Sequence, residues 1–307
     1  MILRQGMKIM TNGLFRLSLF SLTILILCAA AQAEPKIVFE KGDAIWIANL
    51  DGSGSRKLAD GSLPEISPDG TRVAFNTDEG GEKTPVRHIA IVDIASGKVT
   101  QFKEVPSDNS FGPVWSPDGK KLIFSILTEG DWQLALINAD GSGYRIVKRA
   151  QAKDRSYYSP AWASDGKSFF CHDLDFIYLV DLDGKLIKKW ELKTILTKGD
   201  MNSNSRIAAS SDGKWLIMDA DMDEENNREN WDGPPPAIWL LDLASGKATR
   251  LTDKDFFAWD PFWITADEFI FASQGAKEES PSLYRGSTKG KPYHLVLKGA
   301  QMPSASH

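Results

Sequence analysis

The chain has 307 residues, 42% of them hydrophobic, which is large for a single ordinary hydrophobic core. Its 36 basic residues are outnumbered by 41 acidic ones, for a formal net charge of −5, and this balance excludes the basic footprint of a nucleic-acid-binding protein. Cys171 is the only cysteine after residue 33, so the fold has no internal disulfide and depends on burial of apolar side chains.

Residues 1–33 have the pattern of a secretory signal peptide. Arg4, Lys8 and Arg16 come with no acidic residue, and a nearly unbroken apolar run follows from 17 to 31. Small residues then end the segment at Ala33. The run is short for a membrane span, which needs about 20 apolar residues. We therefore expect export with cleavage after Ala33, which leaves 33 basic residues against 41 acidic ones.

A lipid anchor on Cys28 is the alternative to a simple cleaved signal. A lipobox has a small residue before its cysteine, and here Leu27 stands in that place. The cleaved signal peptide is therefore favoured.

A repeated pattern runs through residues 34–307. Three clear copies place a short apolar strand before an Asp-Gly turn, at 63–70, 112–119 and 159–166, and weaker copies begin at Arg206 and Asp260. Aligned on the proline or its equivalent, the copies stand at 64, 113, 160, 207 and 261, at steps of 49, 47, 47 and 54. Self-similarity at this period predicts stacked structural units.

Each copy continues into a β-branched and aromatic strand and then into a hairpin with a second Asp- or Asn-rich turn ending in Gly. Six such hairpins occur but only five innermost strands, and the unmatched hairpin lies at 45–58. Residues 301–306 repeat the inner-strand pattern 42 residues after Pro261. We therefore predict an all-β, six-bladed β-propeller of four-stranded antiparallel blades. Its C-terminal strand pairs in the N-terminal blade and closes the ring.

The Ser-Pro-Asp-Gly turns, the strands of Trp115 and Trp162, and the Asp-x-x-x-Gly hairpins resemble the repeat of the TolB-like propeller family, from about Lys36 to Ser306. The resemblance implies a periplasmic protein that binds an envelope protein or lipoprotein. That family's N-terminal α/β domain has no counterpart before the first strand. Related propellers precede hydrolase domains, but the sequence shows no Gly-x-Ser-x-Gly elbow between a strand and a helix.

The loops that lead into the inner strands, at 105–111, 150–158, 197–205 and 253–259, are expected on one face of the ring. We predict that this face binds a partner, since amphipathic aromatic residues with a few charges typify interface anchors. An equally open interpretation is that the aromatic rings pack between blades. The candidate residues are Asn109, Phe111, Arg155, Tyr157, Tyr158, Asn204, Arg206, Phe256, Phe257, Trp259 and Asp260.

The acidic segment from Asp219 to Glu225 begins an insertion in the fifth blade that runs to Pro236. Calcium binding is an open alternative, but Glu224 and Asn230 stand where a calcium loop needs Gly and Glu, so a solvated loop is favoured. His88, His172 and His294 fall in different blades, with no zinc-type spacing.

The leading hypothesis is thus a single propeller domain at 34–307. We expect a non-catalytic, monomeric interaction module of the cell envelope with no metal and no cofactor. The alternative is a carbohydrate- or lactone-acting enzyme that uses the central channel, with Asn109, Asn204, Arg206 and Asp260 near its mouth.

Overall fold

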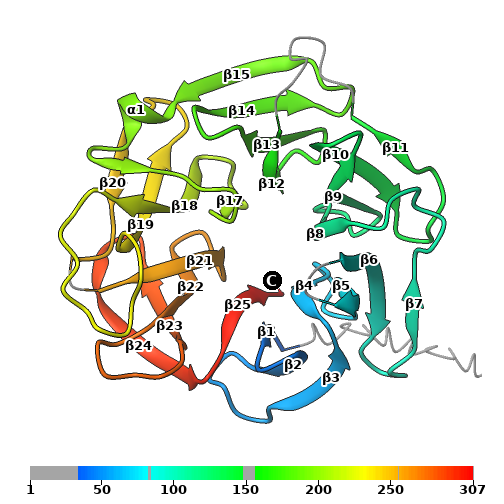
Figure 1. Cartoon of the computed structure of the whole chain (residues 1–307), viewed down its shortest axis with the longest axis horizontal. Coiled ribbons are helices and arrows are strands. Elements are labelled where there is room, and N and C mark those ends of the chain that lie inside the picture. Colours follow the sequence, from blue (N-terminus) through cyan, green and yellow to red (C-terminus); the bar gives the residue numbers. More distant parts are fainter. Residues whose placement is uncertain (1–33, 82–83, 148–155, 255, 307) are drawn as a thin grey trace, which may run out of the picture. The chain divides into compact units, whose positions relative to one another are not determined.

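The computed structural model describes residues 34–81, 84–147, 156–254 and 256–306, so the predicted signal peptide, Cys28 and Arg155 lie outside the described residues. Six antiparallel sheets stand around a central axis as the blades of a propeller (Figure 1), which confirms the predicted fold. The innermost strand of each blade contacts the innermost strand of the next, so the six inner strands form the wall of a central channel.

The first three blades are given from the channel outward. Blade 1 consists of β25 (Gln301–Ala305), β1 (Lys36–Glu40), β2 (Ala44–Asn49) and β3 (Arg56–Asp60). Blade 2 consists of β4 (Ser62–Ile66), β5 (Arg72–Gly81), β6 (Thr84–Asp93) and β7 (Val99–Gln101). Blade 3 consists of β8 (Ser110–Trp115), β9 (Lys121–Thr128), β10 (Asp131–Asn138) and β11 (Arg145–Ile146).

Blade 4 consists of β12 (Tyr158–Trp162), β13 (Ser168–His172), β14 (Phe176–Asp181) and β15 (Leu186–Glu191), followed by the short helix α1 (Leu192–Ile195). In blade 5 two short strands, β16 (Gly199–Asp200) and β17 (Ile207–Ala209), pair with β18 (Trp215–Met222), followed by β19 (Pro236–Asp242) and β20 (Ala248–Arg250). Blade 6 consists of β21 (Ala258–Trp263), β22 (Glu268–Ser273), β23 (Ser282–Ser287) and β24 (Gly290–Lys298). Within the described part of the chain, no helix has the length and apolar character needed to cross a membrane.

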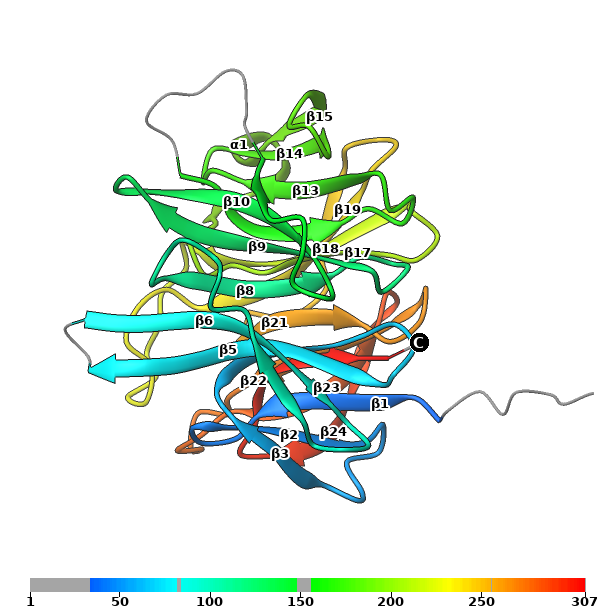
Figure 2. The same cartoon turned by 90° about the vertical axis from the view of Figure 1, so that its right-hand side faces the viewer.

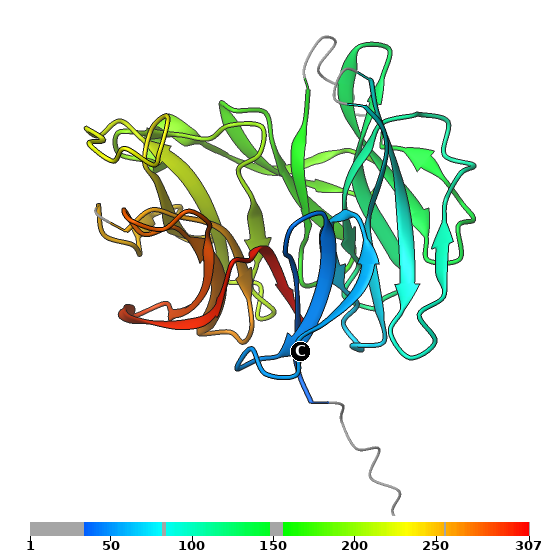
Figure 3. The same ribbon diagram turned by 60° about the horizontal axis from the view of Figure 1, so that its bottom comes forward.

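The ring closes through the two ends of the sequence, as predicted. β25 pairs with β1 in antiparallel register, with Ile37 opposite Ala305 and Val38 opposite Ser304. Figures 1 and 3 both show β25, in red, beside β1, in dark blue. Closure covers the edge of β1 that an open array of blades would expose.

The hydrophobic core is divided among the interfaces between blades. The described residues form six clusters of buried apolar side chains, one between each pair of neighbouring blades. Tryptophans of the repeat add hydrogen bonds to this packing. The Nε1–H groups of Trp115, Trp162 and Trp263 each donate to a backbone carbonyl of the preceding blade at 3.0 Å. The repeated tryptophan therefore holds one blade on the next.

Candidate binding channel

The inner strands of all six blades surround a cavity of about 1230 Å³ that occupies the central channel. One end of the channel, called here the mouth face, carries the loops that lead into the inner strands and those that join the second and third strands of each blade. In Figure 2 this face lies at the left, where β5 ends and β6 begins, and the C-terminal end lies at the right. The described parts of the predicted loops therefore share this end of the channel, while residues 150–155 and 255 lie outside the described residues.

A bulge recurs in the inner strands, beside the residue that precedes each repeat proline. Five of these residues have positive φ, and all five line the cavity: Leu63 (52°), Gly112 (62°), Ser159 (47°), Asp260 (53°) and Met302 (49°). The pairing register shifts at the same places in β4, β8, β12 and β21. A left-handed backbone costs a residue other than glycine about 1 kcal/mol. The bulge turns these residues out of the strand ladder and toward the channel.

Buried polar side chains accept hydrogen bonds from the backbone N–H groups at these bulges. Glu40 accepts from Leu63, Asn76 accepts from Gly112 at 2.9 Å, and Asp219 accepts from Asp260 at 3.2 Å. Each acceptor belongs to the preceding blade. A buried N–H without a partner would be costly, so these residues support the irregular backbone at the mouth.

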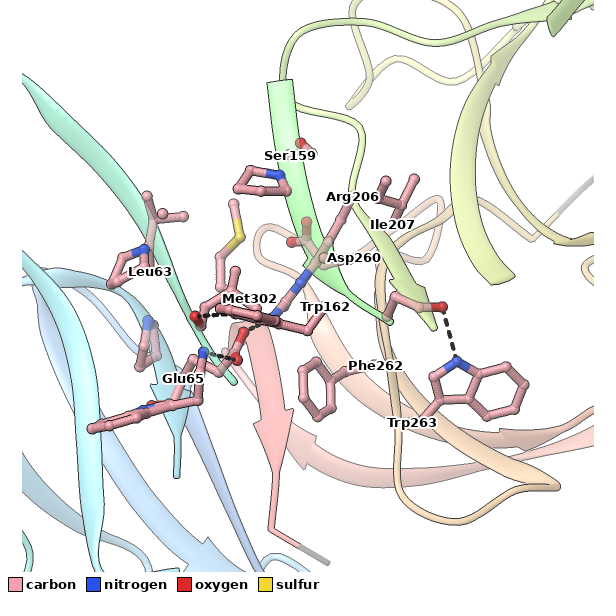
Figure 4. A pocket seen from close by; sticks show the side chains of 18 of the residues that line it. Leu63, Glu65, Ser159, Trp162, Arg206, Ile207, Asp260, Phe262, Trp263 and Met302 are labelled. Carbon is pink, nitrogen blue, oxygen red and sulfur yellow. Dashed lines mark hydrogen bonds and ion pairs between the residues drawn. The ribbon is translucent and has the colours of Figure 1, made fainter. Parts of the chain in front are cut away.

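Arg206 spans the channel. It stands just before β17 in blade 5, yet its guanidinium pairs with Glu65 of β4 in blade 2 (3.4 Å) and donates to the carbonyl of Pro303 in blade 1 (2.8 Å). β17 and β4 lie on opposite sides of the ring (Figure 1). Figure 4 shows the Arg206 side chain directed toward Glu65, with Asp260 and Phe262 close to it. The guanidinium carbon lies 5.0 Å from the centre of the Phe262 ring, a cation–π contact.

Burial raises the pKa of the carboxyl groups around this arginine. Desolvation raises the pKa of Glu65 to about 7, although the Arg206 charge and the Trp115 N–H act against it. Desolvation also raises the pKa of Asp260 to about 7, with the charge of Arg206 lowering it and that of Glu40 raising it. Desolvation is also the main cause of the raised pKa values of Glu40 and Asp219.

The predicted site residues divide into three groups. Phe111, Tyr158, Asn204, Arg206 and Asp260 line the channel cavity. Tyr157 and Phe257 are buried, with 6% and 4% of their surfaces exposed, and pack on Tyr178 and on Trp231. Phe256 packs among Phe271, Tyr284 and Tyr293, while Asn109 and Trp259 are half-buried at the mouth face.

The sequence analysis missed Glu40, Glu65 and Trp132 as channel residues. All three line the cavity, and Trp132 meets Phe111 edge to face with ring centres 6.1 Å apart. Glu65 does carry a signal, because the other inner strands have Val114, Ala161, Ala208, Phe262 and Ser304 at its repeat position. An acidic residue at a repeat position that is otherwise uncharged indicates a role beyond the packing of the propeller.

The expectation of a solvated acidic loop is wrong for the first part of the segment from Asp219 to Glu225, because residues 219–222 belong to β18 and Asp219 is buried. The carboxylates of the segment do not gather at one point. Asp219 accepts two backbone N–H groups, Asp221 accepts the Asn202 amide at 2.7 Å, and Glu224 pairs with Arg250 at 2.6 Å. Among the described residues, no group of three or more His, Cys, Asp or Glu side chains has a metal-binding arrangement. Cys171 is fully buried, and His172 ends β13 with its pKa lowered to about 4 by desolvation.

Replacing Asp260 by Asn is expected to make the protein relatively more stable as the pH rises. Asp260 is 3% exposed, and its pKa of about 7 lies above the ordinary 3.8. The folded state therefore binds a proton more tightly than the unfolded chain between these pH values, and stability falls as the pH rises through this window. Asn cannot ionise, so the stability of the variant does not fall with pH for this reason.

Urea unfolding between about pH 5 and pH 8 measures the effect. The stability difference between Asp260→Asn and the unchanged protein should grow by about 2 kcal/mol. Asp232→Asn, at an exposed aspartate of the β18–β19 loop, is the matched control. A difference that does not change with pH would contradict a buried, ionising Asp260.

The fold and channel define a six-bladed β-propeller with an arginine across its channel. The profile of the TolB β-propeller domain matches residues 32–232. The chain therefore belongs to the TolB β-propeller domain family. Among relatives, it is 26% identical over 193 residues to an uncharacterised peptidase, YuxL, of Bacillus subtilis, covering 60% of this chain and 26% of that protein.

Two further similarities connect the chain to TolB proteins. It is 28% identical over 127 residues to a TolB homologue of Chlorobium chlorochromatii, covering 40% of this chain and 27% of the homologue. The crystal structure of TolB from Acinetobacter baumannii superposes with a TM-score of 0.63 at 18% identity, over 89% of this chain and 66% of TolB. The chain thus spans about a quarter of the length of these two curated relatives.

Proposed function

We propose that the protein is an exported, non-catalytic propeller of the cell envelope whose mouth face binds another envelope protein. In this proposal residues 1–33 are a signal peptide cleaved after Ala33, and residues 34–307 act in the periplasm as a monomeric domain. The observation that carries it is the channel mouth, where Phe111, Trp132 and Tyr158 line an open cavity. Aromatic side chains at the rim of a cavity are typical anchors of protein interfaces. Membership of the TolB domain family supports the periplasmic setting.

Site-specific photo-crosslinking in intact cells tests this proposal. A photoreactive amino acid at Asn204, which is exposed and lines the cavity, should give a defined protein adduct. The same amino acid at Ile187, which is 56% exposed on the outer strand β15, should not give it. If Asn204 gives no adduct while the protein is folded and exported, the proposal fails.

Truncation of the aromatic residues at the mouth should weaken binding to the crosslinked partner. Phe111→Ala and Tyr158→Ala remove rings that line the cavity, and each should cost about 1–3 kcal/mol of binding free energy if the rings are anchors. Titration calorimetry with the purified partner measures the loss, and Ile187→Ser is the control. Equal affinities for all three variants would place the interface elsewhere on the ring.

An activity in the channel is the second candidate function. It is favoured by Glu65 and Asp260, because buried carboxyl groups with a pKa near 7 suit general acid–base chemistry. Purified protein would then turn over lactones or uronate oligomers, and Asp260→Asn would remove this turnover. Equal turnover rates for the unchanged protein and Asp260→Asn would rule out this second function.

A further inference from the structure

The cationic groups that line the channel cavity are already engaged by other residues. Arg206 pairs with Glu65, Arg285 pairs with Glu268, and Arg87 lies 3.5 Å from Asp78. The described lining residues include no lysine. Every positively charged side chain in the described lining of the cavity is therefore already in an ion pair with another residue.

Among the described residues, two carboxyl groups that line the cavity, Glu40 and Asp260, have no cationic partner in an ion pair. Glu40 is held by hydrogen bonds alone, from the Leu63 N–H and from the Gln301 amide at 3.2 Å. The carboxyl group of Asp260 has fewer hydrogen-bond partners. Its Oδ2 atom has none among the described residues, although only 3% of the residue's surface is exposed. An unpaired oxygen at such a position is costly unless an occupant completes it.

The opposite side of the cavity is aromatic. Asp260 belongs to β21 of blade 6 and Glu40 to β1 of blade 1, whereas Phe111 and Trp132 belong to blade 3 and Tyr158 to blade 4. In the ring, blade 6 lies opposite blade 3 (Figure 1). An occupant that satisfies both sides has an apolar stem against the rings and a positively charged head toward the carboxyl groups.

We propose that the channel mouth binds a primary ammonium group on an aliphatic stem, with Asp260 Oδ2 as the acceptor and Glu40 as the second negative charge. This proposal rests on the proposed function and deepens it, because a lysine side chain of the partner supplies that group. The N-terminal residue of a peptide supplies the same chemistry. An ammonium group has three donors that point in different directions, unlike the planar fork of a guanidinium, and this suits two separate carboxyl groups. Asp260 must move to expose Oδ2, since this atom is covered in the structure.

Binding of small amine probes to the full chain tests this site. N-acetyl-lysine N-methylamide presents the side-chain ammonium, leucinamide presents the α-ammonium, and N-acetyl-norleucine N-methylamide is the neutral control of similar shape. Titration up to about 10 mM, followed by NMR, detects weak binding. We expect at least one amine to bind at least tenfold more tightly than the neutral probe, and the one that does identifies the source of the ammonium group.

The variant Asp260→Asn should weaken amine binding at least tenfold, whereas Asp232→Asn should not change it. Binding of the lysine probe, whose ammonium group stays charged over this range, should strengthen from about pH 6 to pH 8. The reason is that Asp260 must lose its proton, and the charged groups that act on it are Arg206, Glu40 and Asp219. Equal affinity for the neutral probe, unchanged binding by Asp260→Asn, or no amine binding would overturn the proposal. A crosslink at Asn204 that persists in Asp260→Asn would leave the proposed function standing while this inference fails.

Discussion

Deletion of residues 301–307 is expected to unfold the protein or to lower its stability by about 5 kcal/mol or more, which is comparable to the whole stability of a domain. The deletion removes β25, the innermost strand of blade 1. Ser304, Ala305 and Ser306 are at most 4% exposed, and the Ser306 N–H and side chain both bond the backbone of Lys36. Without β25, the edge of β1 and the apolar cluster around Ile37 would meet water.

Thermal unfolding of the truncated chain measures the loss, and a synthetic peptide of residues 299–307 tests its cause. If closure is the reason, the peptide should restore a cooperative transition when it is added in excess, because binding to the folded state stabilises it. A peptide of the same composition in scrambled order is the control. A truncated chain that melts within a few degrees of the intact protein would show that the ring does not depend on this strand.

The ring and its closure could be predicted because they depend on local patterns. Each turn and strand signal is contained within about ten residues, and counting hairpins against inner strands shows that residues 301–306 complete the first blade. The inner strand of blade 5 differs from the expected pattern. It is divided into β16 and β17 by the loop at 201–206, where Asn202 bonds the Asp221 side chain and the backbone of Asn204. Ile207 stands there in place of the repeat proline.

The candidate site was less predictable because its contacts join distant parts of the sequence. Arg206 and Glu65 are 141 residues apart, and Arg206 and Pro303 are 97 apart, so no window of sequence contains either pair. The bulges add a second difficulty. A strand alternates its side chains between two faces, and an extra residue changes which face the following side chains occupy. Adjacent residues also take different surroundings, since Tyr158 lines the channel while its neighbour Tyr157 is buried between blades, and the two cannot be told apart by residue type.

Replacing Arg206 by Met is expected to destabilise the protein by about 3 kcal/mol near pH 8, because Glu65 is largely ionised there in the unchanged protein, whereas in the variant it must remain an unpaired buried charge or take up a proton. Glu65 is 5% exposed, and without the guanidinium its main remaining partner is the Trp115 N–H at 2.9 Å. The Pro303 carbonyl would also lose its donor. Met fills much of the volume of the arginine side chain. The loss of stability is therefore expected to come mainly from Glu65 left without its cationic partner, and less from a cavity.

The pH dependence separates this cause from a general packing defect. The Arg206 charge lowers the pKa of Glu65, so removing it raises that pKa further above 7. At about pH 6 the glutamate of the variant is then protonated and neutral, and the destabilisation should be clearly smaller than at pH 8. Urea unfolding at both pH values measures this change. Arg56→Met, at an exposed arginine that bonds the Ile94 carbonyl, is the control and should change stability by less than about 0.5 kcal/mol.

The double variant Arg206→Met with Glu65→Gln completes the argument. Gln keeps an acceptor for the Trp115 N–H but carries no charge, so the buried site is no longer left with an unpaired ion. Replacement of both members of a buried ion pair by neutral groups is often close to neutral, and we expect the double variant to lie within about 1 kcal/mol of the unchanged protein. Its remaining pH dependence would then come largely from Asp260, whose pKa Arg206 also lowers. A double variant as unstable as Arg206→Met alone would mean that Arg206 stabilises the ring by bridging blades 5 and 1, and that its charge on Glu65 is incidental.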